Sequence, residues 1–126
     1  MQAQSPEVCE ELFALYLNAG DVDSLLALYE PQASHIRADG TVPHGNEAIR
    51  LVLDEFVAME PKLDVTLKKV VRPGDDMAVL YDDWTLTAKG ADGNPFNMSG
   101  KSVHIVRRQR DGAWRFAVTG VTNATW

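Results

Sequence analysis

The chain has 126 residues and a net charge of −6, with 45% hydrophobic and 24% charged residues. This length predicts one domain spanning residues 1–126, and the composition is that of an ordinary globular protein. The negative charge argues against nucleic-acid binding, which depends on clustered Lys and Arg, and no apolar run approaches the ~18 residues of a membrane span. The single cysteine, Cys9, and a start that lacks a signal-peptide pattern predict a cytoplasmic protein.

Two helices are expected at the start of the chain. Ser5 and Pro6 are typical of a helix N-terminus, because Ser caps free N–H groups and Pro fits the first helical position. Gly20 predicts the end of this helix, and Asp21 predicts the N-cap of a second helix that Pro31 stops. At helical spacing, the first helix would bury Cys9, Leu12, Phe13, Tyr16 and Leu17, and the second would contain Leu25, Leu26, Leu28 and Tyr29.

A short strand and a third helix follow. Residues 33–37 are predicted to be extended, and a turn and a loop come after them. Asn46 is the predicted N-cap of a helix that runs to about Met59, before Pro61. One side of this helix carries Ile49, Leu53, Phe56 and Val57.

The remaining sequence predicts a meander of four strands. Apolar and polar residues alternate at 63–68, and a second strand is expected from Met77 to Ala88, followed by a looser connection at 89–95. The last two strands are joined by a turn at 109–113, in which Gly112 takes a positive φ angle. Helices followed by an antiparallel meander predict an α+β fold with the helices on one face of the sheet.

The turn at 109–113 sets the register of the last two strands. Placing Gln109 opposite Ala113 predicts three pairs on one face: Arg108 with Trp114, Val106 with Phe116, and His104 with Val118. This face is apolar except for Arg108 at its rim and His104 deeper in. We therefore expect it to face the interior, with His104 as a polar group in an apolar place.

This order of elements, with residues 28–50 (LYEPQASHIRADGTVPHGNEAIR) and 107–116 (RRQRDGAWRF), resembles the nuclear transport factor 2-like superfamily. The chain is most similar to its SnoaL-like and ketosteroid-isomerase-like small proteins. The resemblance implies a cystatin-like cone, a curved antiparallel sheet wrapped around three N-terminal helices, with an apolar pocket for a small apolar or aromatic molecule. Because the superfamily includes isomerases, cyclases, epoxide hydrolases, dehydratases and non-catalytic binding domains, it specifies the fold and not the reaction.

The resemblance also implies a homodimer formed through the outer face of the sheet. An apolar face left to water usually marks an interface. The residues available on that face are Val79, Tyr81, Val103, Ile105 and Ala117.

The catalytic positions of the ketosteroid isomerases can be carried over one at a time. Their oxyanion-hole tyrosine falls on Phe13, which has no hydroxyl, and their proton-shuttling aspartate falls on Arg37, which is not a base at ordinary pH. Their protonated aspartate on the penultimate strand falls on His104. All three roles are changed, so steroid isomerisation by that mechanism is not expected.

The candidate catalytic group combines His104, Asp82 and Arg37. His104 would carry a proton, Asp82 would orient the imidazole ring, and Arg37 would stabilise an anion. The structural alternatives are a satisfied core histidine, a solvated carboxylate, and a salt bridge from Arg37 to Asp39 or Asp82. The predicted ligand wall, which could equally be ordinary core, consists of Phe13, Phe56, Trp84, Trp114 and Phe116.

No metal and no cofactor are expected. His35, His44 and Asp39 lie in or beside a loop, but their spacing matches no zinc pattern, and the chain has no glycine-rich phosphate loop. Two functions remain open. One is a small-molecule-binding domain with acid–base chemistry of the isomerase, cyclase or hydrolase type, and the other is a non-catalytic ligand-binding or dimerisation module of the same fold.

Overall fold

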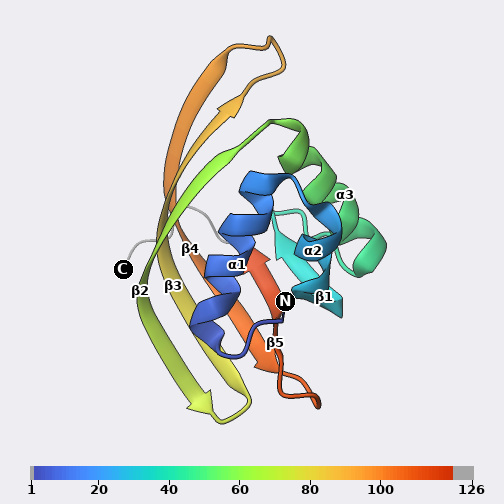
Figure 1. The fold of residues 1–126 in the computed structure, drawn as a ribbon, viewed down its shortest axis with the longest axis vertical. Coiled ribbons are helices and arrows are strands. Elements are labelled where there is room, and N and C mark those ends of the chain that lie inside the picture. Colours follow the sequence, from blue (N-terminus) through green and yellow to red (C-terminus); the bar gives the residue numbers. More distant parts are fainter. Residues whose placement is uncertain (1, 121–126) are drawn as a thin grey trace.

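The computed structural model describes residues 2–120 and shows helices held in the hollow of a curved, open sheet (Figure 1). Five strands pair in the order β1-β5-β4-β3-β2. This is the predicted α+β cone. The elements in chain order are α1 (Pro6–Ala19), α2 (Val22–Ala27), β1 (Tyr29–Ile36), α3 (Asn46–Ala58), β2 (Lys62–Gly74), β3 (Met77–Lys89), β4 (Pro95–Arg108) and β5 (Trp114–Gly120).

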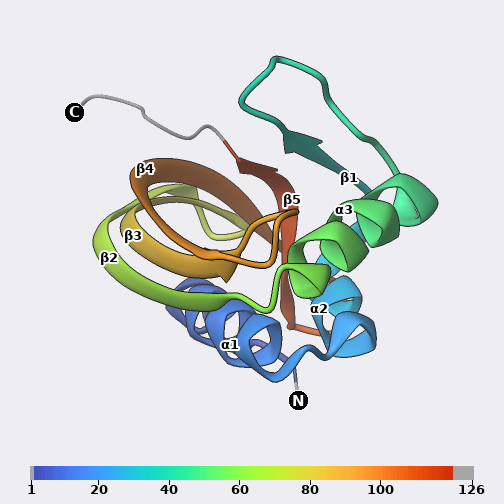
Figure 2. The same ribbon diagram turned by 90° about the horizontal axis from the view of Figure 1, so that it is seen from above.

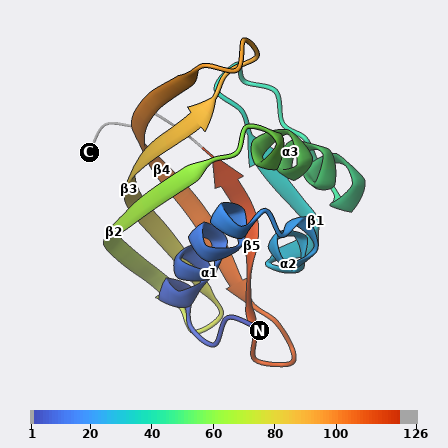
Figure 3. The same ribbon diagram turned by 45° about the horizontal axis from the view of Figure 1, so that its top comes forward.

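The sheet is mixed, whereas the sequence predicts a wholly antiparallel one. Strands β2, β3, β4 and β5 form antiparallel pairs, but β1 runs parallel to β5 at the other edge. Figure 3 shows these two strands side by side, with α2 and α3 flanking β1. No hairpin joins β1 to β5, so local turn chemistry does not determine their relative direction.

Helix α1 lies against the concave side of the sheet (Figure 2). Its predicted ends are confirmed: Ser5 is the N-cap, Pro6 opens the helix, and Gly20 closes it at a φ of 71°. The Asp21 side chain caps α2 by accepting a hydrogen bond from the Ser24 N–H at 3.1 Å. The strand order and these caps bring the α1 face that carries Cys9, Leu12 and Leu17 into the core.

Two predicted helix boundaries are wrong, and β1 and β2 are both longer than the predicted strands at 33–37 and 63–68. Helix α2 ends at Ala27, and Tyr29 opens β1 instead of extending the helix, because Tyr29 pairs with Phe116 and the Phe116 N–H donates to the Leu28 carbonyl. The N-cap of α3 is Gly45 and not Asn46. The Gly45 φ of 87° suits glycine alone among common residues, and its N–H is bonded to Ala33, so the chain turns one residue earlier than predicted.

The last hairpin confirms most of its predicted register and corrects one pair. The Gln109 N–H donates to the Ala113 carbonyl at 2.7 Å, and Val106 pairs with Phe116 as expected. A bulge then shifts the register, so that Val118 pairs with Ile105 and not with His104. The extra residue changes the phase of side-chain alternation and leaves Thr119, which is buried, on the inward face near His104.

The core lies between the helices and the concave face. Leu25, Leu53, Leu80 and Val106 are wholly inaccessible to solvent, and Phe116 is nearly so. Each such side chain contributes roughly 1.5–3 kcal/mol by leaving water. Within residues 2–120, no helix has both the length and the apolar character needed to cross a membrane.

Gly120 is the last residue of β5, between β1 and β4, and replacing it with alanine is expected to destabilise the protein by about 2 kcal/mol or more. Its φ is 119°, and a Cβ atom there would overlap the backbone of Ile36. Urea unfolding would measure the loss. Gly74→Ala is the matched control, because no atom lies within 4 Å of its Cβ position. Equal stability of the two variants would contradict this account.

Candidate functional site

Three ionisable side chains from three elements converge on the inner side of the sheet. His104 Nε2 on β4 lies 3.1 Å from Asp82 Oδ2 on β3 and 3.7 Å from Glu10 Oε1 on α1. The side chains of Glu10 and Asp82 are only 5% and 2% exposed, and that of His104 is 17% exposed. We call Glu10, Asp82 and His104 the acid–base cluster.

The sheet register explains how β3 and β4 bring their members together. Leu80 pairs with His104 and Asp82 pairs with Ser102, so all four side chains project from the same face. This confirms the predicted proximity of His104 and Asp82. Their shared face is the concave one, over which α1 packs.

Glu10 is not among the site residues predicted from the sequence. Its position carries a usable signal, since Glu10, Phe13 and Leu17 follow an i, i+3, i+7 spacing. That spacing puts Glu10 on the buried stripe of α1, where a carboxyl group needs a partner. The partner is the Asp82–His104 pair.

Burial makes Glu10 the proton-holding member of the cluster. Loss of solvent, the hydrogen bond to Asp82 and the negative charge of Asp82 together raise the pKa of Glu10 to about 10, and loss of solvent is the largest of these causes. Glu10 is therefore a neutral carboxylic acid at neutral pH. Glu10 Oε1 and Asp82 Oδ1 are buried and have no hydrogen-bond partner within residues 2–120, and a proton held between the two carboxyl groups would supply one.

The backbone of Gly120 sets the tautomer of His104. The Gly120 N–H donates to His104 Nδ1 at 3.2 Å, so Nδ1 must present a lone pair. In the neutral ring the proton is then on Nε2, where it points to Asp82 Oδ2. Both ring nitrogens are engaged within the protein.

The acid–base cluster also has the residue types of a metal site, and its ligand atoms lie within 4.8 Å of one another. A ligating histidine normally donates its other ring N–H to an acceptor. Here the other nitrogen already accepts the Gly120 N–H, so a metal on Nε2 would require a doubly deprotonated ring. The donor set therefore fits protons better than a cation, and the absence of a metal stays a prediction.

Arg37 forms neither of the two predicted salt bridges, to Asp39 or to Asp82, among the residues that the structure describes. Its guanidinium instead pairs with Glu55 on α3 at 3.3 Å, and both groups are substantially exposed. Asp39 accepts hydrogen bonds from Thr41 in the turn after β1. An anion-stabilising role for Arg37 stays a prediction.

The predicted aromatic wall divides into separate groups. Phe116 lies at the centre, with its ring centroid 5.7 Å from that of His104 and 6.0 Å from that of Phe13. Trp84 donates from Nε1 to Ser102 Oγ at 2.9 Å, on the β3–β4 side of the cluster. Phe56 lies against His35, and Trp114 is paired with Ala3 near the start of α1.

A second polar group lies at the β1–β5 edge of the same face. His35 is on β1 and not in a loop, and its Nδ1 lies 2.9 Å from Thr119 Oγ1, which is 3.4 Å from the Tyr29 hydroxyl. Burial is the main cause that lowers the pKa of His35 to about 4, and the electrostatic effect of the neighbouring His104 and Arg37 acts in the same direction. His35 is therefore neutral at neutral pH. His44 is turned elsewhere, toward Ser34 Oγ at 2.8 Å.

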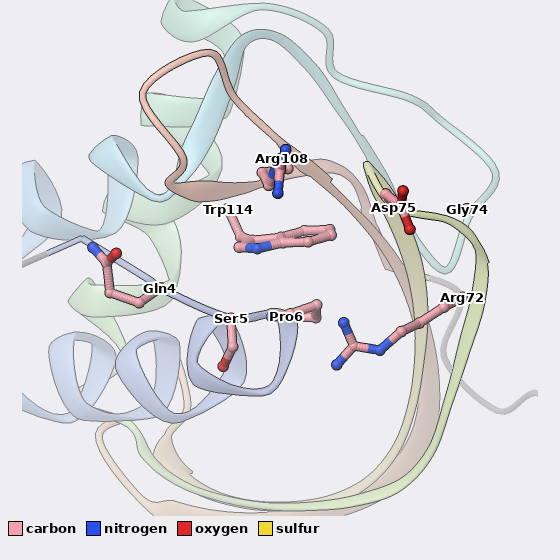
Figure 4. Close-up of a pocket in the computed structure, with 8 residues that line it drawn as sticks. All are labelled: Gln4, Ser5, Pro6, Arg72, Gly74, Asp75, Arg108 and Trp114. Atoms are coloured by element: carbon pink, nitrogen blue, oxygen red, sulfur yellow. The ribbon is translucent and has the colours of Figure 1, made fainter.

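Two cavities lie outside the acid–base cluster. The larger, of about 510 Å³, opens at the N-terminal end of α1 (Figure 4). Its arginines are paired, Arg72 with Glu7 at 2.6 Å and Arg108 with Asp76 at 3.6 Å. The smaller, of about 280 Å³, lies between α2, α3 and the start of β1. Neither is lined by His104, so the predicted apolar pocket beside this residue stays a prediction.

Comparison with known proteins shows the superfamily whose fold this chain shares and the family to which the chain belongs. The fold is that of the nuclear transport factor 2-like superfamily, and the profile of the SnoaL-like domain matches residues 9–117, so the chain belongs to the SnoaL-like domain family. A search of curated proteins returned no match.

Three solved structures illustrate the likeness in fold. A ketosteroid isomerase-like protein from Erwinia carotovora has a TM-score of 0.82 at 15% identity, covering 94% of both chains. A candidate calcium/calmodulin dependent protein kinase II association domain from Xanthomonas campestris has a TM-score of 0.81 at 20% identity, covering 94% of this chain and 84% of that one. A candidate dehydratase from Streptomyces avermitilis has a TM-score of 0.74 at 15% identity, covering 90% of both. At these identities the likeness concerns the fold alone.

Proposed function

We propose that this SnoaL-like domain binds a small, largely apolar molecule on the concave side of its sheet and moves a proton on it. The acid–base cluster performs the transfer, in a reaction of the isomerase or cyclase type. The ligand lies against the aromatic rings around Phe116, and its polar atom faces the cluster.

The observation that carries this proposal is the convergence of Glu10, Asp82 and His104 in a buried place. Burying ionisable groups is unfavourable, and apolar residues of similar size would stabilise the same core at least as well. Strongly shifted groups that cluster in a concave region are typical of active sites. Because burying these three ionisable side chains destabilises the fold, their presence favours a chemical role for the acid–base cluster.

The three members have different roles because their proton states differ. Glu10 is the neutral acid, and Asp82 is the acceptor that links it to the imidazole. His104 is the most exposed member, so it is the group that meets the ligand. Releasing Nδ1 from the Gly120 N–H would present its lone pair to the ligand. Nδ1 would then take a proton from one ligand atom and return it to another, while Nε2–H stays on the Asp82 carboxylate, which stabilises the imidazolium.

Proton transfer can be tested without knowing the natural substrate. Exchange of the hydrogens next to the carbonyl of 2-tetralone for deuterium, followed by proton NMR, measures acid–base activity directly. The wild-type protein should accelerate this exchange, and His104→Gln should lower the rate by about 10²–10⁴-fold, the usual contribution of a general acid or base. Glu10→Gln should lower it as well, while Glu11→Gln, an exposed neighbour on α1, should not.

An absence of acceleration by the wild-type protein would favour a non-catalytic ligand-binding module instead. One observation supports that second candidate: both ring nitrogens of His104 are already hydrogen-bonded or ion-paired within the protein. In that case the cluster would only orient a ligand, and its variants would change affinity without changing any rate.

We also propose that two copies associate through the outer face of the sheet. Val79 pairs with Ile105, Tyr81 pairs with Val103, and these four side chains are half-buried in the single chain. Light scattering at micromolar concentration should give the mass of a dimer. Ile105→Glu should shift that mass to a monomer, because a charge would face a desolvated partner surface. A monomeric wild-type protein would contradict this proposal.

A further inference from the structure

The second polar group, formed by Tyr29, Thr119 and His35, has a hydrogen-bond direction that can be worked out from burial. The Tyr29 side chain is fully enclosed, and its hydroxyl has one partner among the residues that the structure describes, Thr119 Oγ1. A buried hydroxyl hydrogen with no acceptor is strongly unfavourable. The Tyr29 O–H therefore donates to Thr119.

This first donation determines the next one. Thr119 has a single hydroxyl hydrogen, and with Tyr29 as its donor that hydrogen is directed to His35 Nδ1, 2.9 Å away. If His35 Nδ1 carried the proton and donated to Thr119 as well, the Thr119 hydrogen would have no acceptor among residues 2–120. His35 Nδ1 therefore carries a lone pair, and the proton of the neutral ring is on Nε2.

The Nε2–H of His35 has no acceptor within residues 2–120. Nδ1 is hydrogen-bonded to Thr119, and the ring packs edge-on against Phe56, at 5.7 Å between centroids. His35 is half-buried, so its ring is held at the concave side of the sheet with part of its surface accessible. The hydrogen bonds from Tyr29 to Thr119 and from Thr119 to His35 Nδ1 keep the ring proton on Nε2, so Nε2 remains a donor.

We propose that His35 is a fixed hydrogen-bond donor for the ligand, and that its Nε2–H binds a carbonyl or phenolate oxygen. This inference rests on the proposed function, because it concerns a ligand on the same concave face. It narrows the ligand class to flat apolar molecules that carry such an oxygen. The acid–base cluster comes from α1, β3 and β4, whereas His35 is on β1, with β5 between β1 and β4, so the two groups would address different atoms of one ligand.

The tautomer can be measured before any ligand is added. Long-range proton–nitrogen NMR spectra of protein labelled at histidine distinguish a protonated Nε2 from a protonated Nδ1. The wild-type spectrum should show His35 protonated on Nε2 alone at neutral pH. Thr119→Val, which removes the hydroxyl at nearly constant shape, should give a mixture of tautomers. A wild-type ring protonated on Nδ1 would overturn the proposal.

Ligand donation can be measured with 4-nitrophenolate, whose absorbance reports hydrogen bonding to its oxygen, and with nitrobenzene as a probe that lacks this oxygen. His35→Phe keeps a ring against Phe56 but removes the donor. We expect it to weaken 4-nitrophenolate binding by about 10-fold or more, as for loss of a hydrogen bond to a charged group, and to leave nitrobenzene binding unchanged.

The outcomes separate this inference from the proposed function. If 4-nitrophenolate binds equally to the wild type and to His35→Phe but weakly to His104→Gln, the site stands and the role of His35 is overturned. If 4-nitrophenolate does not bind the wild type at all, the ligand class is overturned whatever the tautomer. Deuterium exchange into 2-tetralone by the wild type would support the cluster by itself. The exchange should slow in His35→Phe, because the carbonyl oxygen of 2-tetralone would lose its donor, and an unchanged rate would overturn the role of His35.

Discussion

Glu10→Gln is expected to raise the free energy of unfolding at pH 8 by about 2 to 4 kcal/mol. The pKa of Glu10 is raised from 4.5 to about 10 on folding, so the native protein holds a proton that the unfolded chain releases between these pH values. The contribution of Glu10 to stability is therefore fully present below pH 4.5 and declines as the pH rises toward 10. Glutamine keeps the shape and a hydrogen-bond donor but removes this pH dependence.

Urea unfolding at several pH values between 5 and 9 would measure this effect. The stability of the wild type should decline with rising pH, and that of Glu10→Gln should decline much less. Glu11→Gln, which changes the same charge on the exposed side of α1, should keep the wild-type slope. Parallel slopes for the wild type and Glu10→Gln would show that Glu10 is ionised in the folded protein.

As the pH falls from 6.5 to 4, His35 should lower the free energy of unfolding, and His35→Phe is expected to remove this effect. The pKa of His35 falls from 6.5 to about 4 on folding, mainly because the ring is buried, so between these values the unfolded chain binds the extra proton. The contribution of His35 is fully present above pH 6.5 and is lost as the pH falls toward 4. At most this amounts to about 3 kcal/mol.

The measurement is the change in unfolding free energy between pH 7 and pH 4. The wild type should lose more stability than His35→Phe over this range. His44→Phe is the matched control, since His44 is exposed and bonded to Ser34 at the surface. Between pH 4.5 and 6.5 the effects of Glu10 and His35 have opposite signs, so each single variant should reveal the slope of the other residue. An unchanged acidic slope in His35→Phe would contradict the buried, neutral ring.

Features controlled by neighbouring residues could be predicted from the sequence. The Ser5–Pro6 start of α1, its Gly20 end and the Asp21 cap depend on a few backbone groups within one turn. The turn around Gly112 likewise sets its own local register. These features hold because their hydrogen bonds are made within the segment that specifies them.

Features controlled by distant pairing were harder to predict. The bulge that moves Val118 from the inward to the outward face of β5 depends on how this strand is held between β4 and β1. Tyr29 leaves a helical pattern for a strand for the same reason, because Phe116 is its pairing partner. A single shifted register then changes which side chains meet at the site.

Only part of the candidate site could be predicted, because only some of its residues are brought together by local pairing. His104 and Asp82 come from adjacent strands, so alternation along each strand places them on one face. Glu10 and His35 come from a helix and from the opposite edge of the sheet, and only the tertiary fold brings them to that face. Burial then decides their charge states, and burial is a property of the assembled fold.

The charge state of Glu10 in the folded protein is the central claim. Carbon-13 NMR of protein labelled at the side-chain carboxyl of glutamate would measure it directly, because this carbon resonates at different positions in the acid and in the carboxylate. We expect the Glu10 signal, assigned by its loss in Glu10→Gln, to remain that of a neutral acid at pH 7 while exposed glutamates are ionised. A Glu10 carboxylate at pH 7 would contradict the proton-holding cluster on which the proposed function depends.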